Sequence, residues 1–262
     1  MFQWFYVVIA WIRQAFFDVC NWCVETKDEF LRTIVYNNGW RDLLNGLANT
    51  LIITFFAAII GLVLGIIVAA VRTTYDKNGE AMKHSKSAGY GFLKFFNGLS
   101  KVYLTIIRGT PVVVQLMIIY FVILASVKNG VLVAIIAFGI NSGAYVAEIL
   151  RGGIMSIDGG QFEAGRSIGF NYVQTMMYII IPQVFKNILP TLLNEFITLL
   201  KETSVAGYVA VVDLTRAGDQ IRNATYSAFV PLIVVALVYL AIVMLFTWLV
   251  GIVERSLRKS DR

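Results

Sequence analysis

The chain has 262 residues, of which 58% are hydrophobic and only 15% are charged, and its formal net charge is +6. Soluble domains carry about 25% charged residues, and a soluble fold of this length could not bury so much apolar side chain. The same figures exclude an intrinsically disordered chain. Because the apolar stretches are long and continuous rather than alternating in polarity, they also argue against a transmembrane β-barrel. We therefore expect an all-α polytopic membrane protein.

The first 42 residues precede the first long apolar segment. Residues 2–12 are apolar, but Arg13 and Asp18 follow, and so short a segment cannot cross a bilayer as a helix. This region also contains tryptophans, which favour the membrane–water boundary, at Trp4, Trp11, Trp22 and Trp40. We expect an interfacial helix followed by a loop, with no cleaved signal peptide.

Uncharged apolar segments long enough to cross a bilayer, which takes about 20 residues, occur four times. They lie within residues 43–71, 109–127, 131–147 and 223–253, the last being most apolar over 229–250. A fifth span is predicted within residues 178–200, with its membrane part near 184–200, although charged residues and prolines interrupt it. The sequence thus predicts about five transmembrane helices.

Lysine and arginine are concentrated in one predicted connecting loop. Residues 72–108 hold seven basic and two acidic residues, and the tail 254–262 holds four basic and two acidic ones. Residues 1–42 hold four basic and five acidic residues. The positive-inside rule then predicts that this loop and the C-terminus are cytoplasmic, with the N-terminus outside. Most of the net charge reflects membrane topology, and no nucleic-acid partner is expected.

Residues for enzymatic chemistry are sparse. The chain has no phosphate-binding G-x-x-x-x-G-K-[ST] motif, and its single histidine, His84, lies in the basic segment. Cys20 and Cys23 form a C-x-x-C pair, but a zinc site needs four ligands and a redox site needs a thioredoxin-like context. We therefore expect no catalytic residue, no metal and no cofactor, and two inert thiols.

Two G-x-x-x-G pairs, Gly61 with Gly65 and Gly139 with Gly143, allow helix backbones to approach closely in lipid. They fit either packing within the chain or a contact across a dimer, and the sequence does not separate the two.

A glycine-rich segment, residues 151–182, lies between two predicted spans. Residues 161–168 can form a short helix, with Asp158 as its N-cap and Gly169 at its end. This helix would lie across the cytoplasmic face, where a partner could push it and thereby move both spans. A plain loop that turns the chain is the alternative.

Within that segment, Glu163-Ala164-Gly165 is followed by Gly169 and then by Ile179-x-Ile181-Pro182. This pattern resembles the EAA loop of ABC-importer permeases in all its spacings, with Gly165 in place of Ala and Ile181 in place of Leu. Other segments resemble the polar amino acid branch of that family, which includes histidine and glutamine importer permeases. They are Arg108-Gly109-Thr110-Pro111 with Gln115, Ala144-Tyr145-x-Ala147-Glu148 with Arg151-Gly152-Gly153-Ile154, Gly160-Gln161, and Lys201-Glu202-Thr203-Ser204.

The resemblance covers about residues 45–253. It implies a type I ABC-importer permease, with about five transmembrane helices and a cytoplasmic coupling helix, that pairs with a second copy or a paralogue. Two cytoplasmic ABC ATPase subunits would hydrolyse ATP, and an extracytoplasmic binding protein would deliver a polar amino acid. The permease would lie in the lipid of the bacterial plasma (inner) membrane. We divide the chain into an interfacial segment (1–42), a permease domain (43–253, EAA loop about 156–182) and a cytoplasmic tail (254–262).

Two sets of site residues follow. The resemblance implies that the ATPase couples through the EAA loop, with Glu163 either contacting the ATPase or capping the helix; the set is Gln161, Glu163, Ala164, Gly165, Gly169 and Pro182. Polar residues within spans are costly in lipid and often functional. They make a candidate substrate pathway of Gln115, Asn141, Asn194, Glu195 and Thr198, with Ser142 beside it. Hydrogen bonding between helices is the alternative for this second set.

Glu148 and Arg151 fall near the cytoplasmic end of their span, where we expect a salt bridge or a coupling role. Two other classes of function stay open at the level of sequence. One is a passive channel or ion-coupled carrier that works without an ATPase, and the other is a membrane scaffold without transport. The spacing from Glu163 to Gly169 and Pro182 favours the importer, because a channel has no reason to keep it.

Overall fold

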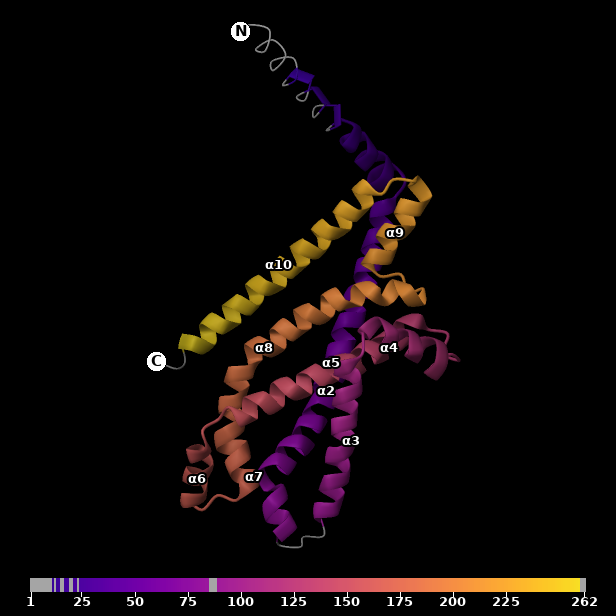
Figure 1. Cartoon of the computed structure of the whole chain (residues 1–262). Helices are drawn as coiled ribbons and strands as arrows, with labels where there is room; N and C mark the ends of the chain where they lie inside the picture. The colour runs from indigo at the N-terminus through magenta and orange to yellow at the C-terminus, as the bar shows by residue number, and fades with distance from the viewer. Residues whose placement is uncertain are drawn as a thin grey trace, which may run out of the picture.

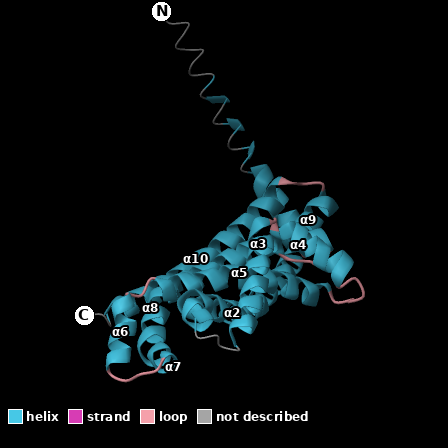
Figure 2. Ribbon diagram, turned by 60° about the horizontal axis from the view of Figure 1, so that its bottom comes forward, coloured by secondary structure: helices cyan, strands magenta, loops and turns pink. Residues whose placement is uncertain are grey.

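The computed structural model describes residues 24–84 and 89–259, together with residues 11, 13–14, 17–18 and 21–22. The described residues form helices and short turns, with no strand among them, so the predicted all-α class is confirmed (Figure 2). The predictions for Trp4, Cys20 and Cys23 lie outside the described residues.

Four helical segments in the described ranges are long and apolar enough to cross a membrane: Gly39–Lys77, Gly130–Met155, Tyr172–Val209 and Phe229–Leu257. They correspond to α2 (Gly39–His84), α5 (Gly130–Met155), a segment centred on α8 (Ile181–Glu202), and α10 (Phe229–Lys259) (Figure 1). A bent pair, α3 (Gly89–Gly109) followed by residues 112–123, makes a fifth when it is counted as one span. The predicted number of about five is therefore confirmed.

Two predicted boundaries are wrong, and both concern the chain between α2 and α5. Residues 72–108 are not a loop, because α2 continues to His84 and α3 then returns beside it (Figure 1). The uncharged segment 109–127 is not one straight span, since the axis turns by 112° between α3 and α4 (Val112–Ile118). Pro111 is the N-cap of α4 and has no N–H to continue the preceding helix.

The described part of the N-terminal arm is mostly helical. Residues 24–36 are helical and end in the π-helical η1 (Leu31–Tyr36), and the prediction of an interfacial helix followed by a loop gave no bounds for either within residues 1–42. The break before α2 comes at Asn38, which has a φ of 57° and so adopts the left-handed conformation that asparagine tolerates. Figure 1 shows this arm projecting beyond the helical bundle.

The centre of the bundle is the pairing of α2 with α5, and the glycine pairs explain it. A Cβ on Gly61 would lie 3.0 Å from the Cβ of Ser142, and one on Gly65 would lie 2.4 Å from Val146 Cγ1. From the opposite helix, a Cβ on Gly139 would lie 2.7 Å from Ile60 Cγ2. The two G-x-x-x-G pairs thus serve packing within the chain. Because the hydrophobic effect does not drive helices together in lipid, the dispersion contacts between these closely approaching backbones stabilise the pairing.

The remaining elements gather at two ends of the bundle. α6 (Gly159–Ser167), α7 (Tyr172–Thr175) and η3 (Met176–Ile180) connect α5 to α8 near the far end of α2. The 3-10 helix η4 (Thr203–Val209) and α9 (Leu214–Thr225) lie at the other end, on the side of the N-terminal arm (Figures 1 and 2).

Candidate functional site

The short helix between α5 and α8 is present and closed at both ends. α6 spans Gly159–Ser167, close to the predicted residues 161–168, and its N-cap is Asp158, as predicted. The Gly160 N–H donates to Asp158 Oδ1 over 2.7 Å. An acidic side chain at this end also interacts favourably with the helix dipole. Since Asp158 is the cap, the alternative capping role for Glu163 is wrong.

Gly169 ends this helix, also as predicted. Its φ of +87° lies in the left-handed region, which glycine enters without a Cβ penalty. The Gly169 N–H donates to the carbonyl of Arg166 over 2.9 Å, and the Phe170 N–H donates to Gly165 over 3.0 Å. These are the bonds by which a glycine satisfies the last carbonyls of a helix.

The two faces of α6 differ. On the inner face, Phe162 is half-buried and stacks on Tyr172 with centroids 6.5 Å apart, and Gly165 is buried against Thr175. A Cβ on Gly165 would lie 2.6 Å from Thr175 Cγ2, which accounts for glycine where the motif has alanine. The outer face is exposed and combines polar and apolar side chains: Gln161, Glu163, Ala164, Ser167 and Ile168. Pro182, also exposed, lies in the first turn of α8.

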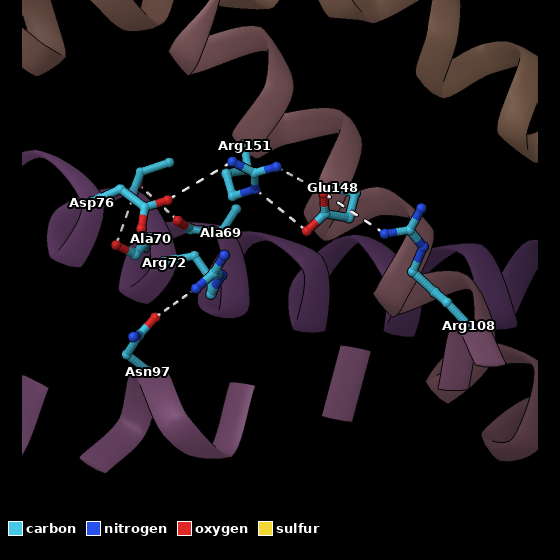
Figure 3. A network of polar contacts seen from close by, with 9 residues as sticks. Ala69, Ala70, Arg72, Asp76, Asn97, Arg108, Glu148 and Arg151 are labelled. Carbon is cyan, nitrogen blue, oxygen red and sulfur yellow. Dashed lines mark hydrogen bonds and ion pairs between the residues drawn. The ribbon is translucent and has the colours of Figure 1, made fainter. Parts of the chain in front are cut away.

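A chain of charged groups lies beside α6, at the end of α5. Arg151 forms ion pairs with Glu148 of its own helix at 3.0 Å and with Asp76 of α2 at 3.8 Å (Figure 3). Glu148 in turn lies 3.7 Å from Arg108, near the end of α3. The predicted Glu148–Arg151 salt bridge is confirmed, and the two other charges that extend it were not foreseen.

Gln115 and Asn141, two of the predicted pathway residues, bind each other. The Asn141 side-chain N–H donates to Gln115 Oε1 over 2.9 Å, and both residues are buried. The Gln115 Nε2 group lies 2.7 Å from the carbonyl of Ile107 and 2.9 Å from that of Thr110. Gln115 therefore holds the bend between α3 and α4 and fastens it to α5.

The other predicted pathway residues lie on α8. Glu195 is half-buried and accepts a hydrogen bond from the Ser142 hydroxyl of α5 over 3.3 Å. Asn194 and Thr198 are exposed, and the Thr198 hydroxyl donates to the Asn194 carbonyl over 3.1 Å. The structure thus separates the predicted set into a buried pair at the bend and a group on α8.

Sequence reasoning missed two further residues of this group, Asn187 and Thr191. Together with Asn194 and Thr198 they recur at intervals of four, three and four residues, which places them along one face of α8. All four are exposed in the single chain. We call these four residues the α8 polar stripe. The helical period was the signal that could have found it, and the stripe lies in a segment long and apolar enough to cross a membrane.

Comparisons with known proteins agree with this arrangement. Residues 86–259 match the family described as binding-protein-dependent transport system inner membrane component. The chain is 37% identical to the arginine transport system permease protein ArtQ of Bacillus subtilis over 222 residues, which is 84% of this chain and 94% of that protein. It is 36% identical to the putative glutamine transport system permease protein GlnP of Rickettsia typhi, covering 82% and 92%.

A solved structure of an amino acid ABC transporter with histidines superposes on this chain with a TM-score of 0.74. The sequence identity is 37%, and the match covers 87% of this chain and 98% of that one.

Proposed function

Because the chain belongs to the family of binding-protein-dependent transport system inner membrane components, the permease subunits of ABC importers, we propose that it imports a polar amino acid. The relatives named for arginine and glutamine transport support this class of solute. A solute-binding protein would deliver the amino acid on the outside, and separate ATPase subunits would drive its passage. A second copy of the chain, or a paralogue, would complete the pathway. A passive channel is not favoured.

The observation that carries this proposal is α6 itself, a capped helix with an open outer face between two spans. Its inner face holds it to the permease through Phe162 and Gly165, so a force on the outer face reaches α5 and α8. Glu163 is exposed and can form a charge-assisted bond with an ATPase groove. We therefore assign Gln161, Glu163, Ala164, Gly165, Gly169 and Pro182 to coupling.

Coupling of this kind shifts an equilibrium. The bundle alternates between inward and outward access, and ATP acts only to the extent that the closed ATPase pair binds one state of the permease more tightly than the other. A rigid α6 serves that purpose because a helix with satisfied ends moves as a unit. Its position at the end of two spans converts the movement into a rotation of those spans.

We assign the substrate pathway to the α8 polar stripe and Glu195. In lipid an exposed side-chain amide finds no partner. Although the Thr198 hydroxyl donates to the Asn194 carbonyl, a stripe of two amides and two hydroxyls is better placed against water or another protein chain than against lipid. A second permease copy facing α8 would enclose the stripe in a polar path. Amide and hydroxyl groups can hydrogen-bond both the ammonium and the carboxylate of an amino acid, and the Glu195 side chain can pair with the ammonium.

Gln115 and Asn141 have a different role in this scheme. The Asn141 side-chain N–H donates to Gln115 Oε1, and Gln115 Nε2 lies within hydrogen-bond distance of two carbonyls at the bend, whereas the buried Asn141 Oδ1 has no hydrogen-bond partner within the chain. We propose that Gln115 shapes the wall of the pathway by fixing the bend, and that Asn141 fastens it to α5.

The orientation that follows puts α6 and the basic end of α2 in the cytoplasm, with the N-terminus outside and the C-terminus inside. Four basic residues against two acidic ones in residues 72–88, which precede α3, and four against two in the tail 254–262 support it. On this assignment η4 and α9 face the binding protein. The interfacial segment, permease domain and tail keep the bounds 1–42, 43–253 and 254–262.

The coupling assignment is tested by changing Glu163 and Gly169 together to alanine. We expect less ATPase co-purifying with the permease and less ATP-driven uptake into proteoliposomes. The matched control changes Glu25, exposed on the N-terminal arm, and Gly98, where an added Cβ meets no atom within 4 Å. If the Glu163/Gly169 variant matches the control in both measurements, the coupling assignment is wrong. Uptake by the permease without any ATPase would refute the importer itself.

The pathway assignment is tested with Thr191→Val and Thr198→Val, which remove a hydroxyl at nearly constant volume. Uptake should fall while the amount of assembled ATPase stays the same. Thr105→Val, at an exposed position of α3 away from the stripe, is the control. Uptake unchanged in both stripe variants would contradict this pathway.

A further inference from the structure

The cytoplasmic extension of α2 touches the coupling helix directly. Lys77 places its ammonium 3.6 Å from the centroid of the Phe162 ring on α6. A cation this close to an aromatic face is attracted by the ring quadrupole. Phe162 is also the residue that stacks on Tyr172, so the same side chain connects α6 to both α2 and the start of the next span.

The residue before it, Asp76, binds a different partner. Its carboxylate lies 3.8 Å from the Arg151 guanidinium at the end of α5 (Figure 3). Consecutive residues on a helix point about 100° apart, so a single turn of α2 reaches α6 with one side chain and α5 with the next. Both contacts lie at the end of the bundle where α6 is attached.

The contacts continue from Arg151 toward the bend. Arg151 binds Glu148, and Glu148 lies 3.7 Å from Arg108, which directly precedes the bend held by Gln115. Side-chain exposures of 28% for Arg151, 23% for Glu148 and 25% for Asp76 make the two Arg151 pairs partly buried, whereas the Arg108 side chain is 46% exposed. Partly buried pairs are screened less by salt than exposed ones. A continuous series of polar contacts therefore joins α6, α2, α5 and α3.

A cavity lies close to these contacts, so fewer other side chains join the elements there. An apolar space of about 370 Å³ lies between α2, α5 and the start of α8, and it is lined in part by Thr73, Ile154 and Tyr172. Side chains across an empty space lose their dispersion contacts. Thr73 of α2 lines this space three residues before Asp76, and Tyr172, which also lines it, stacks on Phe162. The contacts of Asp76 and Lys77 therefore connect α2 to α5 and α6 beside the cavity.

We propose that Asp76 and Lys77 form a second coupling element, through which movement of α6 is passed to α5 and to the α3–α4 bend. The proposal rests on the proposed function, because it takes α6 as the place where the ATPase acts. In this role α2 is not only a membrane span. Its cytoplasmic extension makes α5 and the α3–α4 bend move together with the coupling helix.

The test measures solute transported per ATP hydrolysed in proteoliposomes of the assembled complex. Lys77→Met removes the charge but keeps the stem, and Phe162→Leu removes the ring face but keeps an apolar side chain. Each should lower the transport ratio by about twofold to thirtyfold, the range that a cation–π contact can supply. The double variant should be no worse than the more severe single one, because both changes remove the same contact.

Conservative variants and a distant control complete the design. Lys77→Arg and Phe162→Tyr keep a cation and an aromatic face, so they should keep the wild-type ratio. Lys83→Met removes an exposed charge of the same helix extension and should also leave it unchanged. Asp76→Asn should lower the ratio, since it removes the charge that Arg151 binds.

The outcomes separate this proposal from the proposed function. If the wild-type complex shows no ATP-driven uptake, the proposed function fails. If the wild type transports normally while Lys77→Met and Phe162→Leu keep its ratio, the second coupling element alone is refuted. A purely structural role would reduce the amount of complex and leave the ratio per complex unchanged, and that result would also refute it. Should Lys77→Met not assemble, Lys77→Gln decides, because it removes the same charge with a polar side chain and leaves the stacking of Phe162 on Tyr172 in place.

Discussion

The close contact between Gly165 and Thr175 makes a quantitative prediction for the coupling helix. In Gly165→Ala the new Cβ would lie 2.6 Å from Thr175 Cγ2 and 2.7 Å from its Oγ1, whereas carbon atoms in good contact are about 3.5–4.0 Å apart. Thr175 is 1% exposed and its hydroxyl donates to the Asn171 carbonyl, so it has little room to move. Overpacking of this kind costs about 1–3 kcal/mol.

Alanine is also the better helix former, by about 0.8–1.0 kcal/mol, which would partly hide the effect. Gly159→Ala provides the comparison, because an added Cβ at this position of the same helix meets no atom within 4 Å. We expect the α6 amide hydrogens to exchange about 5- to 140-fold faster in Gly165→Ala than in Gly159→Ala, the equivalent of 1–3 kcal/mol. Amide hydrogen exchange on the purified complex measures this local unfolding of α6 residue by residue.

Thr175→Ala removes both atoms that the new methyl would meet. In that background the difference between the two glycine variants should therefore nearly vanish. Equal exchange in Gly165→Ala and Gly159→Ala with Thr175 present would refute the packing explanation for glycine at this motif position. Persistence of the difference without Thr175 would assign the effect to another neighbour, and Ile179, whose Cδ1 would lie 3.2 Å away, would be the first to examine.

Two more predictions concern the bend and the opposite end of the bundle. Gln115→Leu leaves two carbonyls and the Asn141 amide without their partners, which costs about 1–3 kcal/mol for each buried group. The thermal unfolding temperature should therefore fall clearly below that of Val114→Leu, a control at an exposed position. Equal unfolding temperatures would contradict the role of Gln115 in holding the bend. Burial raises the pKa of Asp213, the N-cap of α9, although two backbone N–H groups donate to it. The folded chain then holds this proton more tightly than the unfolded chain. The carboxyl therefore favours folding increasingly as the pH falls from the raised pKa toward the ordinary one, and the penalty is complete above the raised pKa. Asp213→Asn should remove the contribution of this carboxyl to the pH dependence of the thermal unfolding temperature. If the unfolding temperatures of the variant and the wild type change with pH in parallel, the carboxyl remains solvated in the folded chain.

The coupling helix could be predicted from the sequence because its signals are local. Asp158 caps it, Gly169 ends it, and neither depends on contacts with distant parts of the chain. The membrane spans could be predicted for a similar reason, since length and apolarity alone decide whether a helix suits a bilayer. The spacing of the motif from Glu163 to Pro182 then indicated the family before any fold was known.

The bend at Pro111 could not be predicted, because the lack of charge in residues 109–127 indicates an apolar environment but does not indicate the direction in which the helix axis runs. Asn187 and Thr191 share a helical period with Asn194 and Thr198 that is visible in the sequence, but only the structure shows that all four side chains are exposed. The role of Gly165 depends on Thr175, ten residues later, which no local pattern connects to it.

The amino-acid sequence by itself determined that this chain is a helical membrane protein with a capped helix between two spans, since periodicity, apolarity and capping act over a few residues. Only the tertiary structure decided that the glycine pairs join α2 to α5 within one chain, that Gln115 holds a bend, and that Asp76 and Lys77 reach two different elements. These properties depend on which surfaces meet, and long-range packing in the bundle sets that.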